Sequence, residues 1–187
     1  MGDKRTLILN AAIRLFAKDG VGVPTAKIAK EASVSNGTLF NYFETKQDLL
    51  DGACLYVVER MATEILGDVD LSDSVKDMFL CVWIKFVNWA NKNPLDDKVL
   101  GLLKTSQIVS ESVLEEGHNL FAPINDAMGQ AVKDKTLLDL PIELMLDIAR
   151  AHLDATVNYI RENKLKKVEV EGLVRISFDI YWRGISL

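Results

Sequence analysis

The fold is decided by the stretch Ser33-Val34-Ser35-Asn36-Gly37-Thr38-Leu39-Phe40-Asn41-Tyr42-Phe43. Its first residues are typical of a turn, and Ser35 suits the N-cap of a helix because its hydroxyl accepts a hydrogen bond from a free backbone N–H. We therefore expect a short helix over about residues 36–42. Its expected apolar face consists of Leu39, Phe40 and Phe43.

Two more helices are expected before this one. An amphipathic pattern covers residues 4–19 and ends at Gly20, and a short helix follows Pro24 from Thr25 to about Ala32. Two short helices joined by a turn and braced by a first helix predict a helix-turn-helix, in which the second helix of the pair enters the major groove of DNA.

The exposed residues of that second helix fit contact with DNA. They are small, polar or hydrogen-bonding: Asn36, Gly37, Thr38, Asn41 and Tyr42. Asn pairs with adenine edges, Thr meets a thymine methyl or a phosphate, and Gly lets the backbone approach closely. A scaffold has no need of such a face.

A long helix is expected over about residues 46–67, opened by a capping pair of Thr45 and Asp48. Lys46 in its first turn opposes the helix dipole, and a nearby phosphate would reverse that cost. The alternative is a lysine that is simply solvated.

The charge is unevenly distributed. The net charge is −5, but residues 1–50 carry seven basic and five acidic residues, or +2, while the remaining 15 basic and 22 acidic residues give −7. A slightly basic N-terminal segment on an otherwise acidic chain favours local DNA contact, although an ordinary protein surface can also carry a charge of +2.

The remainder is predicted to be helical, which makes the fold class all-α. Helices are expected over about residues 72–92, 95–108, 111–134, 141–163 and 168–185, with Pro123 kinking or splitting one of them. Apolar residues make up 49% of the chain and charged residues 26%, as in a globular domain. No apolar run is long enough to cross a bilayer, so we expect a cytoplasmic protein without membrane contact.

The ordered pattern of these segments resembles the N-terminal domain of TetR-type (tetracycline repressor-like) bacterial transcriptional regulators. The resemblance lies in Ile8–Phe16, Pro24–Ala32, Val34–Phe43 and Thr45–Leu50. It implies about nine helices, a DNA-binding domain over residues 1–45, and a ligand-binding and dimerisation domain over residues 46–187. It also implies a homodimer.

The resemblance assigns roles by position. Thr25 corresponds to a residue that contacts a DNA phosphate, and Tyr42 and Lys46 correspond to residues that contact the DNA backbone. The positions that correspond to groove-facing residues are Asn36, Gly37, Thr38 and Asn41. The candidate DNA-binding set, with the capping serine, is Thr25, Ser35, Asn36, Gly37, Thr38, Asn41, Tyr42 and Lys46.

The chain departs from the family pattern at three places. Phe40 stands where the family often has Tyr, so a hydroxyl contact to phosphate is missing. Ser33 stands where the turn usually has Gly, and Ser is less comfortable at positive φ. The N-terminal arm is short, with only Lys4 and Arg5 as basic residues, so arm contacts to the minor groove are minimal.

Two groups of residues in the segment 46–187 are candidates for effector binding. Phe79, Trp83, Phe86 and Ala90 share one helical face and form either packed core or the apolar wall of a cavity. His152, Thr156 and Tyr159 form a stripe of hydrogen-bonding groups that Asn125 and His118 would join. A core or interface histidine is the alternative for His152. The candidate ligand-binding set is Phe79, Trp83, Phe86, Asn125, His152, Thr156 and Tyr159.

The last helix is apolar on more than one side, which suggests an oligomer interface through Leu173, Ile176 and Ile180. Cys54 and Cys81 are expected to be buried free thiols, because they show no metal or disulfide spacing.

No enzyme motif is present: the sequence contains no phosphate loop, nucleophile elbow or HExxH. Acidic pairs such as Asp96-Asp97 are expected on solvated faces, and no cofactor or metal is expected. The sequence thus predicts a regulator, most simply a repressor that a small molecule releases from a palindromic operator in double-stranded DNA. The alternative is a helical scaffold or binding protein whose helix-turn-helix serves packing only.

Overall fold

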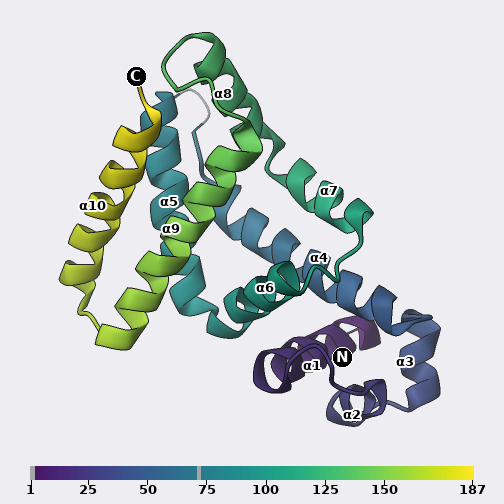
Figure 1. Ribbon diagram of the computed structural model, residues 1–187. Coiled ribbons are helices and arrows are strands. Elements are labelled where there is room, and N and C mark those ends of the chain that lie inside the picture. Colours follow the sequence, from purple (N-terminus) through teal and green to yellow (C-terminus); the bar gives the residue numbers. More distant parts are fainter. Residues whose placement is uncertain (1–2, 71–72) are drawn as a thin grey trace. The chain divides into compact units, whose positions relative to one another are not determined.

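The computed structural model describes residues 3–70 and 73–187, and this part of the chain contains ten α-helices (Figure 1). They are α1 Lys4–Asp19, α2 Thr25–Glu31, α3 Asn36–Tyr42, α4 Lys46–Leu66, α5 Val75–Lys92, α6 Pro94–Ser106, α7 Glu111–Leu120, α8 Ala122–Lys133, α9 Ile142–Asn163 and α10 Lys167–Ile185. The all-α prediction is confirmed. Ten helices replace the expected nine because the segment 111–134 is split next to Pro123, the second residue of α8.

The chain forms two compact units. One unit contains the described residues up to Arg60 together with Asn93–Leu120, and the other contains the described residues of Met61–Lys92 together with Phe121–Leu187. The division passes through α4, so this helix belongs to both units. The functional boundary expected at residue 45 is a different kind of division and stays a prediction.

The first unit is organised around α1. Asp3 caps this helix by accepting a hydrogen bond from the Arg5 backbone N–H, and Gly20 ends it at φ 83°, where a side chain would be strained. Its buried face packs against α2, α3 and α6 and consists of Ile8, Leu9, Ala11, Ala12, Ile13, Leu15, Phe16 and Ala17. This apolar contact fixes the short helices α2 and α3, which are too short to be stable alone.

The second unit is a bundle of α5, α9 and α10, each of which packs against the other two, with α8 against α5 and α9 (Figure 1). Trp83 lies in its core, 5.1 Å from the ring of Tyr181 and 5.8 Å from that of Phe178, measured between centroids. The Tyr181 hydroxyl donates to the Met145 carbonyl at 3.0 Å, and burial raises the pKa of Tyr181 to about 12. This aromatic cluster ties the three helices together.

Two expectations about burial are wrong, one for an acidic pair and one for a cysteine. Asp96 and Asp97 are both buried, not solvated, at the start of α6. Asp96 forms an ion pair with Arg60 of α4 at 3.1 Å, and burial raises its pKa although Arg60 acts in the opposite direction. Cys54 is buried as expected, and burial raises its pKa to about 11, whereas Cys81 is only half-buried.

Candidate nucleic-acid interface

The turn between α2 and α3 has the geometry that the sequence predicts. Backbone N–H groups of Ser33 and Val34 donate to the carbonyls of Lys30 and Ala29 at 3.1 and 3.0 Å. Ser33 has φ 56°, so it occupies the left-handed region where this family pattern usually has Gly. The turn therefore keeps its shape at the cost of a strained serine.

The predicted N-cap of α3 is confirmed. The Ser35 hydroxyl accepts a hydrogen bond from the Thr38 backbone N–H at 3.0 Å and lies 2.9 Å from the Thr38 hydroxyl. Both hydroxyls are thus engaged with each other at the start of the helix. The Thr38 hydroxyl is therefore engaged in the cap, whereas its methyl group is not.

One face of α3 anchors the helix and the other is open to solvent. Leu39 is fully buried and Phe43, which follows the helix, is also buried. The exposed residues are Asn36, Gly37, Phe40, Asn41 and Tyr42, and Thr38 is half-buried. Gly37 is not required by backbone conformation, and a Cβ at this position would meet only the Ser35 hydroxyl oxygen at 3.9 Å. Four of the five predicted helix residues are therefore exposed together on one short helix.

The prediction that Phe40 belongs to the apolar face is wrong, because this ring is 38% exposed. Consecutive residues of an α-helix differ by about 100° in direction, and the buried direction of α3 is already set by Leu39 and Phe43. Phe40 thus lies on the flank of the open face. The one sequence signal for the exposure of Phe40 was that the family often has Tyr at this position.

Lys46 is the first residue of α4 and is half-buried. The capping pair before it is confirmed: the Thr45 N–H donates to Asp48 Oδ2 at 2.8 Å, and the Asp48 N–H donates to Thr45 Oγ1 at 3.1 Å. Asp48 offsets the positive end of the helix dipole, so the first turn accommodates Lys46 at less cost. Thr25 is the first residue of α2, whose N-cap is Pro24 and has no side-chain hydrogen bond. The start of α2 therefore leaves backbone N–H groups available.

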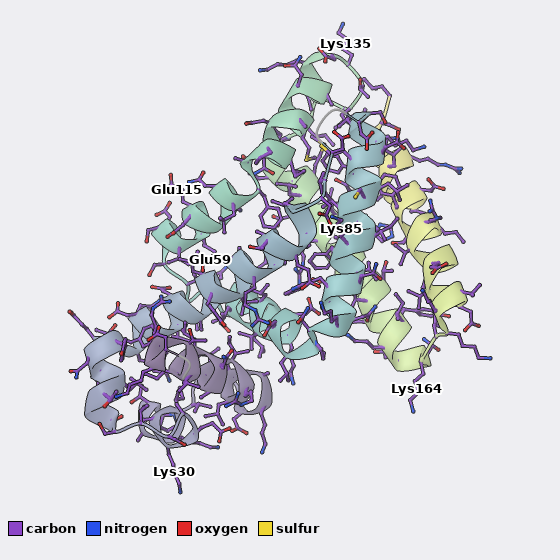
Figure 2. The ribbon with its side chains drawn as sticks, turned by 180° about the vertical axis from the view of Figure 1, so that it is seen from behind. Lys30, Glu59, Lys85, Glu115, Lys135 and Lys164 are labelled. Atoms are coloured by element: carbon purple, nitrogen blue, oxygen red, sulfur yellow. The ribbon has the colours of Figure 1, made fainter. Side chains whose placement is uncertain are left out.

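The basic residues of this unit are partly neutralised. Lys27 pairs with Asp19 at 2.7 Å, which lowers the pKa of Asp19, and Arg14 pairs with Glu31 at 3.4 Å. Lys30, in contrast, projects away from the end of α2 (Figure 2). The positive charge available to a polyanion is therefore smaller than the count of basic residues indicates.

The aromatic candidates for effector binding lie in the core of the second unit. Phe79, Trp83 and Phe86 are buried, as is Ala90. Phe79 packs on Trp182 at 6.4 Å, and the Arg150 guanidinium lies 4.7 Å above the ring of Phe86. Ring-to-ring contacts fit the packed-core alternative, and a role as the wall of an effector site stays a prediction.

The polar stripe of α9 does not face one surface. His152 is half-buried with its ring 5.5 Å from Trp83, and burial lowers its pKa. Thr156 is buried, donates to the His152 carbonyl at 2.9 Å and lies 2.6 Å from the Ser177 hydroxyl, whereas Tyr159 is 53% exposed. Asn125 on α8 is half-buried and His118 on α7 is exposed. Thr156 thus links α9 to α10, and the expected common stripe is not formed.

An open groove of about 530 Å³ in this unit was not expected from any sequence signal. Its lining comes from α5, the end of α9 and the start of α10: Ile84, Asn88, Asn91, Ile160, Leu165, Lys167, Val170, Glu171, Val174 and Arg175. None of the candidate ligand-binding residues is in this lining.

Apolar side chains are exposed along α9 and α10. Ile176 and Ile180 are 59% and 61% exposed, and Leu173 is half-buried. A second stripe, which the sequence prediction missed, runs along α9 at helical spacing through Leu144, Ile148, Ala151, Ala155 and Tyr159, all exposed. The periodicity of α9 was its signal, because it carries apolar residues on two sides.

Within residues 3–70 and 73–187, no group of three or more His, Cys, Asp and Glu side chains is arranged to hold a metal ion. In the same ranges, no helix has the length and apolar character needed to cross a membrane.

Comparisons with known proteins point to one family. Residues 8–53 match the family model of bacterial regulatory proteins, tetR family. The nucleoid occlusion factor SlmA of Shewanella baltica (strain OS155) is 29% identical over 98% of this chain and 93% of its own. The HTH-type transcriptional regulator LuxR of Vibrio harveyi is 35% identical over 69 residues, which are 36% of this chain and 34% of that protein.

Solved structures agree over the whole length. A Shewanella sp. PV-4 protein assigned to the tetR family of transcription regulators is 29% identical and covers 100% of both chains with a TM-score of 0.91. A TetR family transcription regulator from Marinobacter aquaeolei VT8 is 18% identical, covers 98% of this chain and 95% of its own, and has a TM-score of 0.87; at this identity it shows the fold alone.

Proposed function

Because this chain is a DNA-binding transcriptional regulator that belongs to the TetR family, we propose that it binds a palindromic operator as a homodimer and represses transcription until a small molecule releases it. One observation carries the proposal: α3 is anchored by Leu39 and Phe43 while small and polar residues cover its open face.

The open face of α3 supplies the base contacts. Asn41 is exposed in the middle of this face and carries both a donor and an acceptor, which match N7 and N6 of adenine. A bidentate contact of this kind discriminates against a wrong base by about 1–3 kcal/mol. Asn36 and the methyl group of Thr38 extend the same surface, and Gly37 leaves room for the DNA backbone.

Phosphate contacts would set the position of this helix in the groove. The first turn of α4 carries the Lys46 ammonium, which attracts a phosphate, beside a helix end whose Asp48 N–H is already bound by Thr45. Thr25 at the start of α2 and the Tyr42 hydroxyl are further donors beside α3. These contacts give affinity without sequence preference, so they depend on salt concentration.

The exposed apolar stripes of α9 and α10 support a homodimer. Ile176 and Ile180 on one helix and Leu144 and Ile148 on the other are removed from water if two copies pair through this surface. A two-fold pair of helix-turn-helix units reads half-sites about 34–36 Å apart, which makes the operator palindromic.

An effector site in the second unit is supported by one buried donor. The indole Nε1 of Trp83 is buried without a hydrogen-bond partner among the described residues, beside the ring of His152. Buried donors without partners are rare in folded proteins, and an effector with an apolar body and an acceptor atom would supply the missing partner. It releases DNA only if it binds the two conformations of the dimer with different affinity.

A second candidate is a role like that of the nucleoid occlusion factor relative. The likeness to that protein spans 98% of this chain, including the body, whereas the likeness to LuxR covers 36%. A nucleoid occlusion role predicts that loss of the gene alters cell division relative to the nucleoid while transcripts beside the binding sites stay unchanged. A repressor predicts that loss of the gene changes the transcripts beside the binding sites and leaves cell division unchanged.

The first test is selection of random duplex DNA by the purified protein at two salt concentrations. The proposal predicts enrichment of a palindrome with half-sites one helical turn apart, more strongly at low salt. The scaffold alternative predicts no enrichment at either concentration, and that result would contradict the proposal. Matching the enriched sequence to promoters, with transcript levels in a deletion strain, then separates the two candidate roles.

A further inference from the structure

Phe40 is an apolar side chain on an otherwise polar surface. It is 38% exposed, whereas Leu39 before it is fully buried and Phe43 is 3% exposed. The packing of α3 is provided by these two residues. Phe40 is thus outside the fully buried core, and the exposed part of its ring leaves apolar surface in water in the free protein.

The ring is left open by the residue one turn earlier. Side chains on a helix lean toward its N-terminus, so the side chain of Phe40 is directed toward the turn that carries Asn36 and Gly37. Gly37 has no side chain, and a Cβ there would meet nothing closer than the Ser35 hydroxyl oxygen at 3.9 Å. The guanidinium of Arg5 lies over the ring of Phe43, not over that of Phe40. The outward edge of the Phe40 ring therefore faces open space.

A phenyl ring has no hydrogen-bond donor and cannot bind a phosphate or the polar edge of a base. The major groove offers it one apolar group, the 5-methyl of thymine. We propose that Phe40 reads a thymine in each half-site through contact with this methyl group. The proposal rests on the proposed function, because it requires that α3 enters the major groove. Phe40 shares one exposed surface with Gly37 and Asn41, which we assign to DNA contact. The ring is therefore expected to contact DNA and not a protein partner.

The experiment uses the duplex that the wild-type protein enriches from random DNA. Each thymine of the half-sites is replaced in turn by uracil, which removes the methyl group and keeps base pairing. Burial of one methyl group converts to about a fourfold change in affinity as an upper value, so we expect a two- to fourfold loss at one position of each half-site. The loss is expected to multiply when both half-sites carry uracil.

The same series with Phe40→Ala decides whether this residue is responsible. The variant is expected to bind the thymine and uracil duplexes equally at that position, while Phe40→Leu keeps part of the preference. Leu7→Ala is the matched control: it removes another exposed apolar side chain, 45% exposed on α1, and is expected to keep the full uracil penalty. Thermal midpoints establish that every variant is folded at the temperature of the binding measurements.

The outcomes separate the two proposals. Absence of any enriched duplex would overturn the proposed function, and this inference with it. Specific binding with an equal uracil penalty in wild type and Phe40→Ala would overturn this inference alone. A changed oligomeric state in Phe40→Ala, without a changed uracil penalty, would assign the ring to a protein contact and would equally overturn it.

Discussion

Asp51 joins the first half of α4 to the connection between α6 and α7, and its replacement by Ala is a sharp test of this contact. Its carboxylate accepts hydrogen bonds from the Ser110 backbone N–H at 2.9 Å and from the Ser110 hydroxyl at 2.5 Å. Gln47 also donates to it at 3.1 Å, and the same amide donates to the Ile108 carbonyl at 2.7 Å.

The expected destabilisation follows from these hydrogen bonds. Hydrogen bonds to a charged group contribute about 1.5–3 kcal/mol when well shielded, but this site is only half-buried, so we assign about 1 kcal/mol to each Ser110 bond. The Gln47 bond is exposed and adds little. Asp51→Ala should therefore lower the free energy of unfolding by about 2 kcal/mol, or the melting temperature by about 4–8 °C in a chain of this length. Ser110→Ala keeps the backbone donor and should be destabilised by about half as much.

The assay is urea unfolding and thermal melting at one fixed protomer concentration, because the proposed homodimer would make stability depend on concentration. Glu44→Ala, which changes an exposed acid in the segment before α4, is the control and should stay within about 0.5 kcal/mol of wild type. If Asp51→Ala is as stable as this control, the connection is not held by these hydrogen bonds and the reasoning is refuted.

Three other predictions concern Gly37, Lys46 and His152. Gly37→Ala should stabilise the protein by about 0.5–1 kcal/mol, since the added methyl group enters open space on a helix, yet weaken DNA binding by blocking close approach; a melting curve and a titration with the enriched duplex check both, and undiminished binding would contradict the assigned role. Lys46→Ala should weaken binding to all sequences and reduce the slope of log affinity against log salt by about one for each phosphate that Lys46 neutralises; an unchanged slope would leave Lys46 a solvated residue. Burial holds the pKa of His152 below its ordinary value of 6.5, so the unfolded chain takes up this proton first, and the stability that the neutral imidazole provides is lost as pH falls below about 6.5. His152→Gln should therefore lose less stability than wild type between pH 7.5 and 5, measured by urea unfolding, and an equal or larger loss would contradict this sign.

The sequence predicts best what local chemistry decides. As the sequence predicts, α1 ends at Gly20, α3 begins after the Ser35 cap, and α4 begins at the Thr45–Asp48 pair. The predicted helix over residues 111–134 is split next to Pro123. Each of these signals acts through the hydrogen bonds of its own turn, so no knowledge of distant residues is needed.

The sequence predicts poorly what distant residues decide. Phe40 is apolar and adjoins Leu39, but a helix as short as α3 needs few anchors, and Phe43 supplies the second. Asp96 is buried because α6 packs in the first unit and Arg60, 36 residues earlier, is its partner. Which of the two apolar sides of α9 is exposed depends on α5 and α10, which pack against this helix from other parts of the chain.

Base recognition by the open face of α3 underlies the proposed function, and the decisive measurement is a repeat of the random-duplex selection with Asn41→Ala. We expect the enriched palindrome to keep its half-site spacing but to lose its preference at the same position of both half-sites, since only the adenine contact has been removed. An enriched sequence identical to that of the wild-type protein would contradict base reading by Asn41 and by the face that it centres.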